Sequence, residues 1–147
     1  MQVVIDTREQ QPWTFEGLGV TRIKAKLEAG DYSLPGLERR VAIERKSIDD
    51  WVGTVLRDRA RFYRELELLR AYEFRCVIIE ASVRQIMEGR FKSQMNPSAV
   101  MGFIGEVSVA QSVPVYLGGT RAEAQVLALG LLRAASSRFG IQKQSQE

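Results

Sequence analysis

The first third of the chain carries short apolar runs that are typical of strands. The strands predicted from these runs are residues 3–5, 20–25, 30–34 and 40–46. Residues 9–19 contain one proline and two glycines, so this segment is predicted to be a loop. Pro35 and Gly36 favour a tight turn, which would join the last two strands into a hairpin.

From Ser47 onward the apolar positions mostly recur at helical spacing. Helix N-caps are predicted at Ser47, Ser82, Asn96 and Thr120, and Glu123 would complete a capping box with Thr120. A further helix is predicted over residues 58–73, and the last helix is expected to end near residue 138. Two more strands are predicted at residues 75–80 and 113–117, and the first of these is apolar enough for the centre of a sheet.

This order of elements predicts an α/β fold, in which a mixed central sheet is flanked by helices on both faces. A chain of 147 residues fits one domain, which we place at residues 1–140, followed by a flexible tail at 141–147. No apolar run approaches the roughly 18 residues that a membrane span requires, so we expect no membrane association. The N-terminus lacks the pattern of a secretion signal, and a cytoplasmic location is expected, or a nuclear one in a eukaryote.

The composition narrows the possible chemistry, because the chain has no histidine and only one cysteine, Cys76. Histidine-dependent hydrolases, histidine-ligated zinc and an internal disulfide are therefore excluded. Catalysis would have to use carboxylates, lysine, arginine, tyrosine or hydroxyls, and a metal would be a hard cation with oxygen ligands. The net charge of +3 permits binding to nucleic acid without demonstrating it.

Acidic residues lie at the ends of the predicted early strands, and a lysine accompanies them. Positions i and i+2 of a strand share a face, so Glu44 and Lys46 are expected to project together. The predicted hairpin would bring Asp31 opposite that pair. Carboxylates next to a lysine suit a magnesium-dependent phosphodiesterase, although a Glu-x-Lys pair on a strand is more often a solvated cross-strand pair. Convergence of Asp6, Glu9, Asp31 and Glu44 would favour the enzyme, since clustered carboxylates repel one another unless a cation is bound.

Three segments in order resemble the nuclease domain of the XPF-type structure-specific endonucleases. They are VVIDTRE (3–9), GDYSL (30–34) and IERKSIDDW (43–51), and the last contains the signature Glu-Arg-Lys-x-x-x-Asp. RFYREL (61–66) and CVIIE (76–80) are similar to the helix and core strand that follow in that family. The resemblance is strong over residues 3–80, and it implies a restriction-endonuclease-like fold with cleavage of DNA that depends on Mg²⁺ or Mn²⁺.

The resemblance also implies roles for individual residues. Asp31, Glu44 and the main-chain carbonyl of Arg45 would bind the metal, and Lys46 would be the catalytic lysine. Asp6 and Glu9 would join the acidic site through a second metal or bound waters. Arg8 and Arg45 would contact phosphate or hold the acidic cluster in place. Asp50 would support Lys46 or Arg45. DNA binding is implied for Arg61, Tyr63 and Arg64.

The expected substrate is branched DNA, such as flaps, forks or four-way junctions, because the XPF-type family that the sequence resembles cleaves such structures. A helix-hairpin-helix domain, which larger members of that family append, is not expected here. Two alternatives remain open: a non-catalytic DNA-binding or scaffolding module, and a junction resolvase or phage DNA-processing nuclease of the same fold. The final helix is apolar around much of its circumference, so we expect a homodimer through the C-terminal helices, or a heterodimer with a paralogue.

Overall fold

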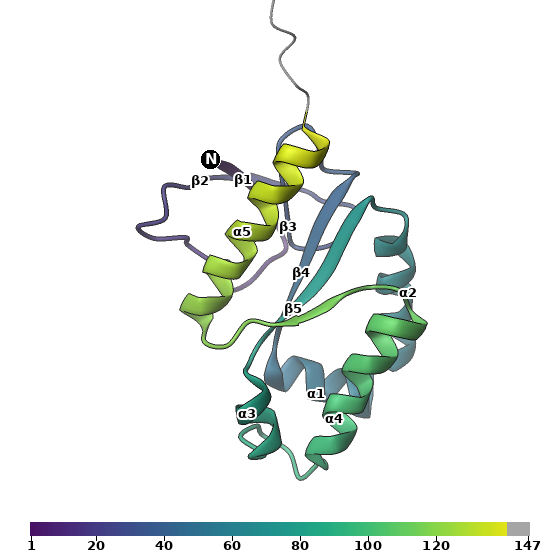
Figure 1. Ribbon diagram of the computed structural model, residues 1–147. Coiled ribbons are helices and arrows are strands. Elements are labelled where there is room, and N and C mark those ends of the chain that lie inside the picture. The colour runs from purple at the N-terminus through teal and green to yellow at the C-terminus, as the bar shows by residue number, and fades with distance from the viewer. Residues whose placement is uncertain (141–147) are drawn as a thin grey trace, which may run out of the picture.

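The computed structural model describes residues 1–140, which are built around one mixed six-stranded sheet (Figure 1). The strands are β1 (Gln2–Asp6), β2 (Thr21–Ala25), β3 (Tyr32–Ser33), β4 (Val41–Ser47), β5 (Phe74–Glu80) and β6 (Val115–Leu117). Their order across the sheet is β2-β1-β3-β4-β5-β6. β3 runs antiparallel to both of its neighbours, whereas the pairs β1–β2, β4–β5 and β5–β6 are parallel.

Helices cover both faces of this sheet, as predicted. They are α1 (Ile48–Leu56), α2 (Arg59–Arg70), α3 (Val83–Met87), α4 (Pro97–Gly105), the π-helical segment η1 (Glu106–Ala110) and α5 (Arg121–Phe139). Figure 1 shows α5 lying across one face, with α1, α2 and α4 grouped on the side away from it. The α/β fold with a mixed sheet is therefore confirmed.

Strand alternation divides the interior into two apolar cores, one on each face of the sheet. On β5, Cys76 and Ile78 pack with α5, whereas Val77 and Ile79 pack with α1, α2 and α4. Each core contains a buried tryptophan with aromatic neighbours: Trp51 on the α1 side and Trp13 on the α5 side. The sheet is thus held from both faces, which fixes the ends of its central strands.

The predicted helix starts are confirmed by their capping hydrogen bonds. The hydroxyl of Ser47 accepts from the amide of Asp50, and that of Ser82 accepts from the amide of Gln85. Asn96 caps α4 in the same way, with Pro97 in the first turn. At α5, Thr120 and Glu123 form the complete capping box.

Several boundaries differ from the prediction. The predicted strand 30–34 is reduced to Tyr32–Ser33, because Gly30 adopts a left-handed φ of 74° where the chain turns. A Cβ atom at Gly30 would lie 3.1 Å from the Cβ of Ala42 and 3.2 Å from the carbonyl oxygen of Ile43, so the backbones approach closely there. The helix predicted at 58–73 spans only Arg59–Arg70, and the strand predicted at 113–117 is limited to Val115–Leu117.

The predicted tail, residues 141–147, lies outside the described residues. Within residues 1–140, no helix has the length and apolar character needed to cross a membrane.

Candidate active site

Strand β4 presents three consecutive residues to opposite faces of the sheet. Glu44 and Lys46 line a common pocket near α1 and α2, as their spacing predicts. Arg45, between them, directs its guanidinium to the other face, where it pairs with Glu9 and Glu80. The Glu-Arg-Lys signature therefore supplies two pocket-lining side chains, Glu44 and Lys46, and one side chain, Arg45, that forms ion pairs on the opposite face.

Asp31 is fixed beside β4 by hydrogen bonds of both its backbone and its side chain. Its amide donates to the carbonyl of Ile43 at 2.8 Å, and its own carbonyl accepts from the amide of Asp6 at 2.8 Å. One carboxylate oxygen, Oδ2, accepts from the amide of Arg45 at 2.8 Å. Because the ladder between β3 and β4 ends at Tyr32 and Ile43, the Asp31 side chain takes the place of a main-chain acceptor for Arg45.

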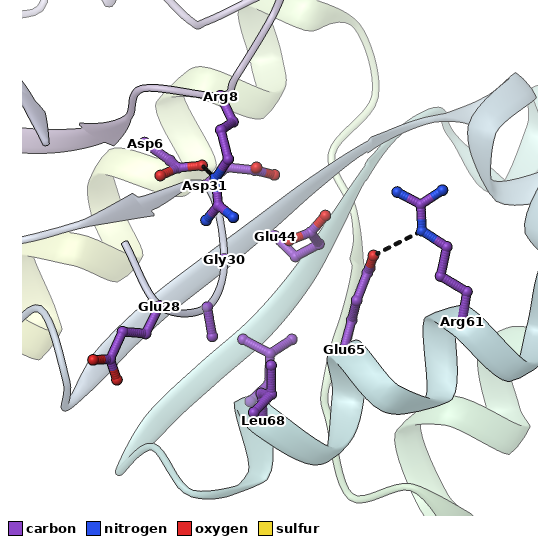
Figure 2. Close-up of a pocket in the computed structure, with 11 residues that line it drawn as sticks. Asp6, Arg8, Glu28, Gly30, Asp31, Glu44, Arg61, Glu65 and Leu68 are labelled. Atoms are coloured by element: carbon purple, nitrogen blue, oxygen red, sulfur yellow. Dashed lines mark hydrogen bonds and ion pairs between the residues drawn. The ribbon is translucent and has the colours of Figure 1, made fainter. Parts of the chain in front are cut away.

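The Asp31 and Glu44 carboxyl groups line one pocket of about 330 Å³. Asp6 and Arg8 lie at one side of this pocket, and Arg61 and Glu65 of α2 lie at the other (Figure 2). Glu44 also lines the two neighbouring pockets, and Lys46 lines both of these as well. The three pockets therefore meet at Glu44, which makes this carboxyl the centre of the candidate site.

The electrostatics of the two carboxyl groups differ from those of ordinary surface acids. Burial raises the pKa of Asp31 to about 7, in spite of the hydrogen bond from the Arg45 amide, and the charge of Glu9 adds to the rise. Burial likewise raises the pKa of Glu44 well above its usual value. The charges of Asp31 and Glu65 raise the pKa of Glu44 further, while that of Lys46 opposes them.

The pair of Asp31 and Glu44 fits a divalent cation by the chemistry of its donor atoms. Both supply carboxylate oxygens, the ligands that hard cations prefer. Burial, together with neighbouring acids, raises the pKa of both groups, and a bound cation would offset this cost of ionising them. Among residues 1–140, however, no three acidic or cysteine side chains are arranged to hold a metal ion. Asp6 and Glu9 each line a pocket with Asp31 and Glu44, and their expected roles through a second metal or bound waters stay predictions.

Asp6, predicted to be a metal ligand, is already engaged by protein groups. Its Oδ1 accepts from the amide of Leu27 at 2.8 Å, and its Oδ2 accepts from Nε of Arg8 at 2.9 Å. Arg8 also donates to the carbonyl of Leu27 at 2.6 Å. Asp6 is buried and borders the same pocket as Asp31, and each of its carboxylate oxygens already accepts one hydrogen bond. Its expected role as a metal ligand stays a prediction.

Glu9 and Arg45 form a buried ion pair at the edge of the candidate site, where both residues line a pocket with Asp31, Glu44 and Lys46. Nε and Nη2 of Arg45 each lie 3.1 Å from a Glu9 carboxylate oxygen, and Nη1 donates to Glu80 at 2.5 Å. Burial opposes the charge of Arg45, but these hydrogen bonds outweigh it and raise the pKa of the guanidinium. Only 9% of the Arg45 side chain is exposed, and its guanidinium is engaged by Glu9 and Glu80. This position agrees with support of the acidic residues, and the predicted phosphate contact of Arg45 stays a prediction.

Lys46 is held by a hydroxyl and an aromatic ring. Its Nζ donates to Oγ1 of Thr54 at 3.4 Å and lies 4.8 Å from the ring centroid of Phe62. The Thr54 hydroxyl in turn donates to the carbonyl of Asp50 at 2.9 Å. Asp50, expected to support Lys46 or Arg45, thus reaches Lys46 through its main chain and Thr54, and its exposed side chain borders the pocket.

The α2 residues predicted to bind DNA have different environments. Arg61 and Arg64 are exposed, and Arg61 lies 3.8 Å from Glu65 at the rim of the pocket. Tyr63 is partly buried and packs near Phe103, with ring centroids 6.2 Å apart. The two arginines are accessible to a ligand, whereas the partly buried ring of Tyr63 packs against the core.

The structure also identifies residues that the sequence analysis did not single out as functional. Glu65 faces Glu44 across the pocket, and the RFYREL segment could have identified it because it follows Arg61 by one helical turn. Thr54 and Phe62, which contact Lys46, carry no such signal, since a buried threonine or phenylalanine in a helix is an ordinary core residue. Glu80 and Arg121 join the network around Arg45 over a separation that no local pattern reveals.

Comparison with known proteins gives a family and a fold. The family model described as the ERCC4 domain matches residues 5–126. A solved structure of XPF from Aeropyrum pernix is similar to this chain with a TM-score of 0.73 and 19% identity, covering 94% of this chain and 66% of that one. XPF from Aeropyrum pernix in complex with DNA gives a TM-score of 0.70 at 19% identity, covering 97% of this chain and 68% of the other. No curated protein matches the sequence.

Proposed function

This chain belongs to the ERCC4 domain family, and we propose that it is a metal-dependent endonuclease that cleaves branched DNA. The observation that carries the proposal is the juxtaposition of Asp31, Glu44 and Lys46 at pockets that meet on Glu44. The chain spans 66% of the first similar XPF structure, so the substrate is proposed from the site and the family rather than transferred from that protein.

Asp31 and Glu44 would hold Mg²⁺ or Mn²⁺, together with the main-chain carbonyl of Arg45. The cation would supply Lewis-acid activation of water and would neutralise charge on the scissile phosphate. Within the protein, the Arg45 amide orients Asp31, and the turn at Gly30 places that carboxyl beside β4. A carboxylate fixed in this way costs little reorganisation when its charge is needed.

We propose that Lys46 neutralises charge on the reacting phosphate or orients the attacking water. Its ammonium lies on the same face as Glu44, and Thr54 and Phe62 restrict its position. An ammonium held next to a carboxylate site can hold a water molecule in line or stabilise charge that develops on the phosphate oxygens.

DNA binding is proposed for the exposed arginines that border this site. Arg8 and Arg61 line the pocket, and Arg64 follows on the same helix as Arg61. Forked guanidinium donors suit phosphate oxygens, and such contacts position the backbone without reading sequence. One of the similar XPF structures is a complex with DNA, which supports this use of the fold.

The proposal also includes a homodimer through α5, with a heterodimer as the alternative. α5 buries Ala124, Ala128 and Leu132 against its own sheet, yet Val126 on the same helix is 59% exposed. An exposed apolar side chain on a helix whose other face is already packed is compatible with contact to a second chain.

A DNA-binding or scaffolding module without catalysis is the competing function. It would require the basic surface but no intact acidic site. The presence of Asp31, Glu44 and Lys46 in one arrangement favours the nuclease over this module. A junction resolvase or phage DNA-processing enzyme would share the site and would differ in its choice of branch.

The test is cleavage of labelled flap, fork, four-way junction and plain duplex DNA in Mg²⁺, Mn²⁺ or EDTA. The wild-type protein is expected to cut branched DNA only with metal, and Asp31→Asn and Glu44→Gln are each expected to slow cleavage by about 100-fold or more while DNA binding persists. Glu67→Gln, which removes an exposed acid of α2, is the control and should cut normally. Binding without cleavage by the wild type would support the scaffolding module, and equal cleavage of plain duplex would reject the preference for branches.

A further inference from the structure

A chain of ion pairs connects the candidate active site to the first turn of α5. Arg45 donates to Glu9 on one side and to Oε1 of Glu80 on the other. The same Glu80 oxygen lies 3.3 Å from Nη1 of Arg121. The network therefore joins the segment after β1, strands β4 and β5, and helix α5.

Arg121 also holds the segment that carries Glu9. Its Nη2 donates to the carbonyl of Gln11 at 2.7 Å and to the carbonyl of Pro12 at 2.9 Å. One turn later on α5, Oε1 of Gln125 accepts from the amide of Phe15 at 2.8 Å. Arg121 and Gln125, in the first two turns of α5, thus anchor this segment by side-chain contacts to the backbone of Gln11, Pro12 and Phe15.

The interior of this network is largely shielded from water. Exposed fractions of the side chains are 7% for Glu9, 9% for Arg45 and 11% for Glu80, but 41% for Arg121. Buried charges are stable only when each has its partners in good geometry, so the loss of one partner leaves a charge uncompensated. Arg121 closes the network at its solvent side.

The consequence reaches the carboxyl group of Asp31 through the backbone of β4. The Arg45 amide donates to Asp31, and Arg45 lies between Glu44 and Lys46 in the strand. A shift of the Arg45 side chain would therefore also shift the Arg45 backbone. That backbone orients Asp31 and sets the positions of Glu44 and Lys46.

We propose that Arg121 and Glu80 are positioning residues for the reaction, acting through Arg45 on Asp31, Glu44 and Lys46. The inference rests on the proposed nuclease function for its effect on rate, although its structural part can be measured without DNA. Arg121 is assigned this role rather than phosphate contact, because its two terminal nitrogens already donate to Glu80, Gln11 and Pro12.

The test compares Arg121→Ala and Arg121→Lys with Arg133→Ala, which removes an exposed arginine from the same helix. For each protein, kcat and KM are measured on the branched substrate that the wild type cuts best, and DNA affinity is measured over a range of salt. Amide hydrogen exchange of Gln11, whose amide donates to Glu9 at 3.2 Å, and of Phe15 reports on the segment in the absence of DNA and metal.

Arg121→Ala is expected to lower kcat about tenfold with KM unchanged, because catalytic groups tolerate little displacement. Exchange at Gln11 and Phe15 should accelerate, the DNA affinity and its salt dependence should stay the same, and Arg121→Lys should recover part of kcat. A salt dependence whose slope falls by about 1 would identify a phosphate contact and overturn the proposal.

Two further outcomes would also overturn the inference. An unchanged kcat with accelerated exchange would show that Arg121 anchors the segment without serving the reaction. Unchanged exchange would show that Arg121 does not hold the segment at all. A wild-type protein that cuts no DNA would instead refute the proposed function. In that case, accelerated exchange in Arg121→Ala would still show that Arg121 holds the segment, so the two failures can be told apart.

Discussion

Glu44 and Arg45 are neighbours in the sequence, yet they act on opposite faces of the sheet. Glu44 joins Asp31 at the pocket, whereas Arg45 is enclosed by Glu9 and Glu80. A single strand therefore carries the proposed cation ligand and the group that braces it. Substitutions at Glu44 and at Arg45 should therefore reduce activity for different reasons: the first removes a proposed cation ligand, and the second removes the residue that positions it.

The raised pKa of Asp31 makes stability depend on pH when no cation is bound. With its pKa raised from 3.8 to about 7, folded Asp31 holds its proton more strongly than the unfolded chain does, so its ionisation opposes folding. This contribution favours the folded protein below the unfolded pKa and is lost as pH rises through about 7. In EDTA, Asp31→Asn should therefore melt at a higher temperature than the wild type at pH 8, and the difference should shrink toward pH 4.

Thermal melting of both proteins across that pH range checks the prediction, with Glu67→Gln as an exposed-acid control that should follow the wild type. Melting temperatures of Asp31→Asn and wild type that stay a constant distance apart would show that Asp31 ionises normally in the folded protein.

At the residue scale, sequence reasoning placed Asp31, Glu44 and Lys46 in one region because strand alternation and hairpin pairing are local rules. It placed Asp6 and Glu9 near the same site but could not identify their partners, because a carboxylate at a strand end gives no sign of the group that it will contact. Asp6 is taken by Arg8 and the Leu27 amide, and Glu9 by Arg45, and both choices depend on the folded backbone.

At the scale of elements, the caps explain why the helices begin where they do. The first turn of α5 has the strongest such signal, because Thr120 and Glu123 satisfy each other's backbone amides. That same turn carries Arg121, so the cap contributes to the position of the network as well as to the stability of the helix.

Thr120→Ala is expected to cost about 1 kcal/mol of unfolding free energy, because it removes the acceptor for the Glu123 amide. Urea denaturation measures the loss, and Ser137→Ala near the other end of α5 is the control, expected to change stability by less than about 0.5 kcal/mol. If Thr120→Ala were as stable as the wild type, the capping box would contribute nothing in solution.

The ends of helices and strands were predicted best where a capping residue marks them. They were predicted worst where contacts between distant parts of the chain determine where an element ends. The shortening of β3 follows from the close approach of Gly30 to Ala42 and Ile43, which no propensity encodes. The π-helical segment Glu106–Ala110 continues α4 without a break in apolar spacing, so the pattern alone reads as one helix. Pairing of β2 parallel to β1 likewise follows from the return of the chain along the sheet edge.

At the scale of the whole molecule, the excess of positive charge and the position of α5 bear on its partners. The net charge of +3 and the exposed arginines of α2 favour association with an anionic polymer. Helix α5, which carries the exposed Val126, lies on the sheet face opposite α1 and α2 (Figure 1), so the proposed DNA contacts and the proposed second chain would use different faces of the molecule.

The proposed dimer predicts a specific response to charge on α5. Analytical ultracentrifugation at micromolar concentration should show a dimer for the wild type and a monomer for Val126→Asp, since burying a lone carboxylate in an interface is unfavourable. Val83→Asp, which changes a similarly exposed valine on α3, should remain a dimer. A wild type that sediments as a monomer would remove the dimer from the proposal.

The most direct measurement of the central claim is Mn²⁺ binding followed by electron paramagnetic resonance in the absence of DNA. If Asp31 and Glu44 hold the cation, the wild type should bind Mn²⁺, and Asp31→Asn and Glu44→Gln should each weaken binding by about tenfold or more. Glu28→Gln, which changes an acid at the rim of the same pocket, should bind as the wild type does. Equal Mn²⁺ affinity in the wild type and in both site variants would contradict the claim.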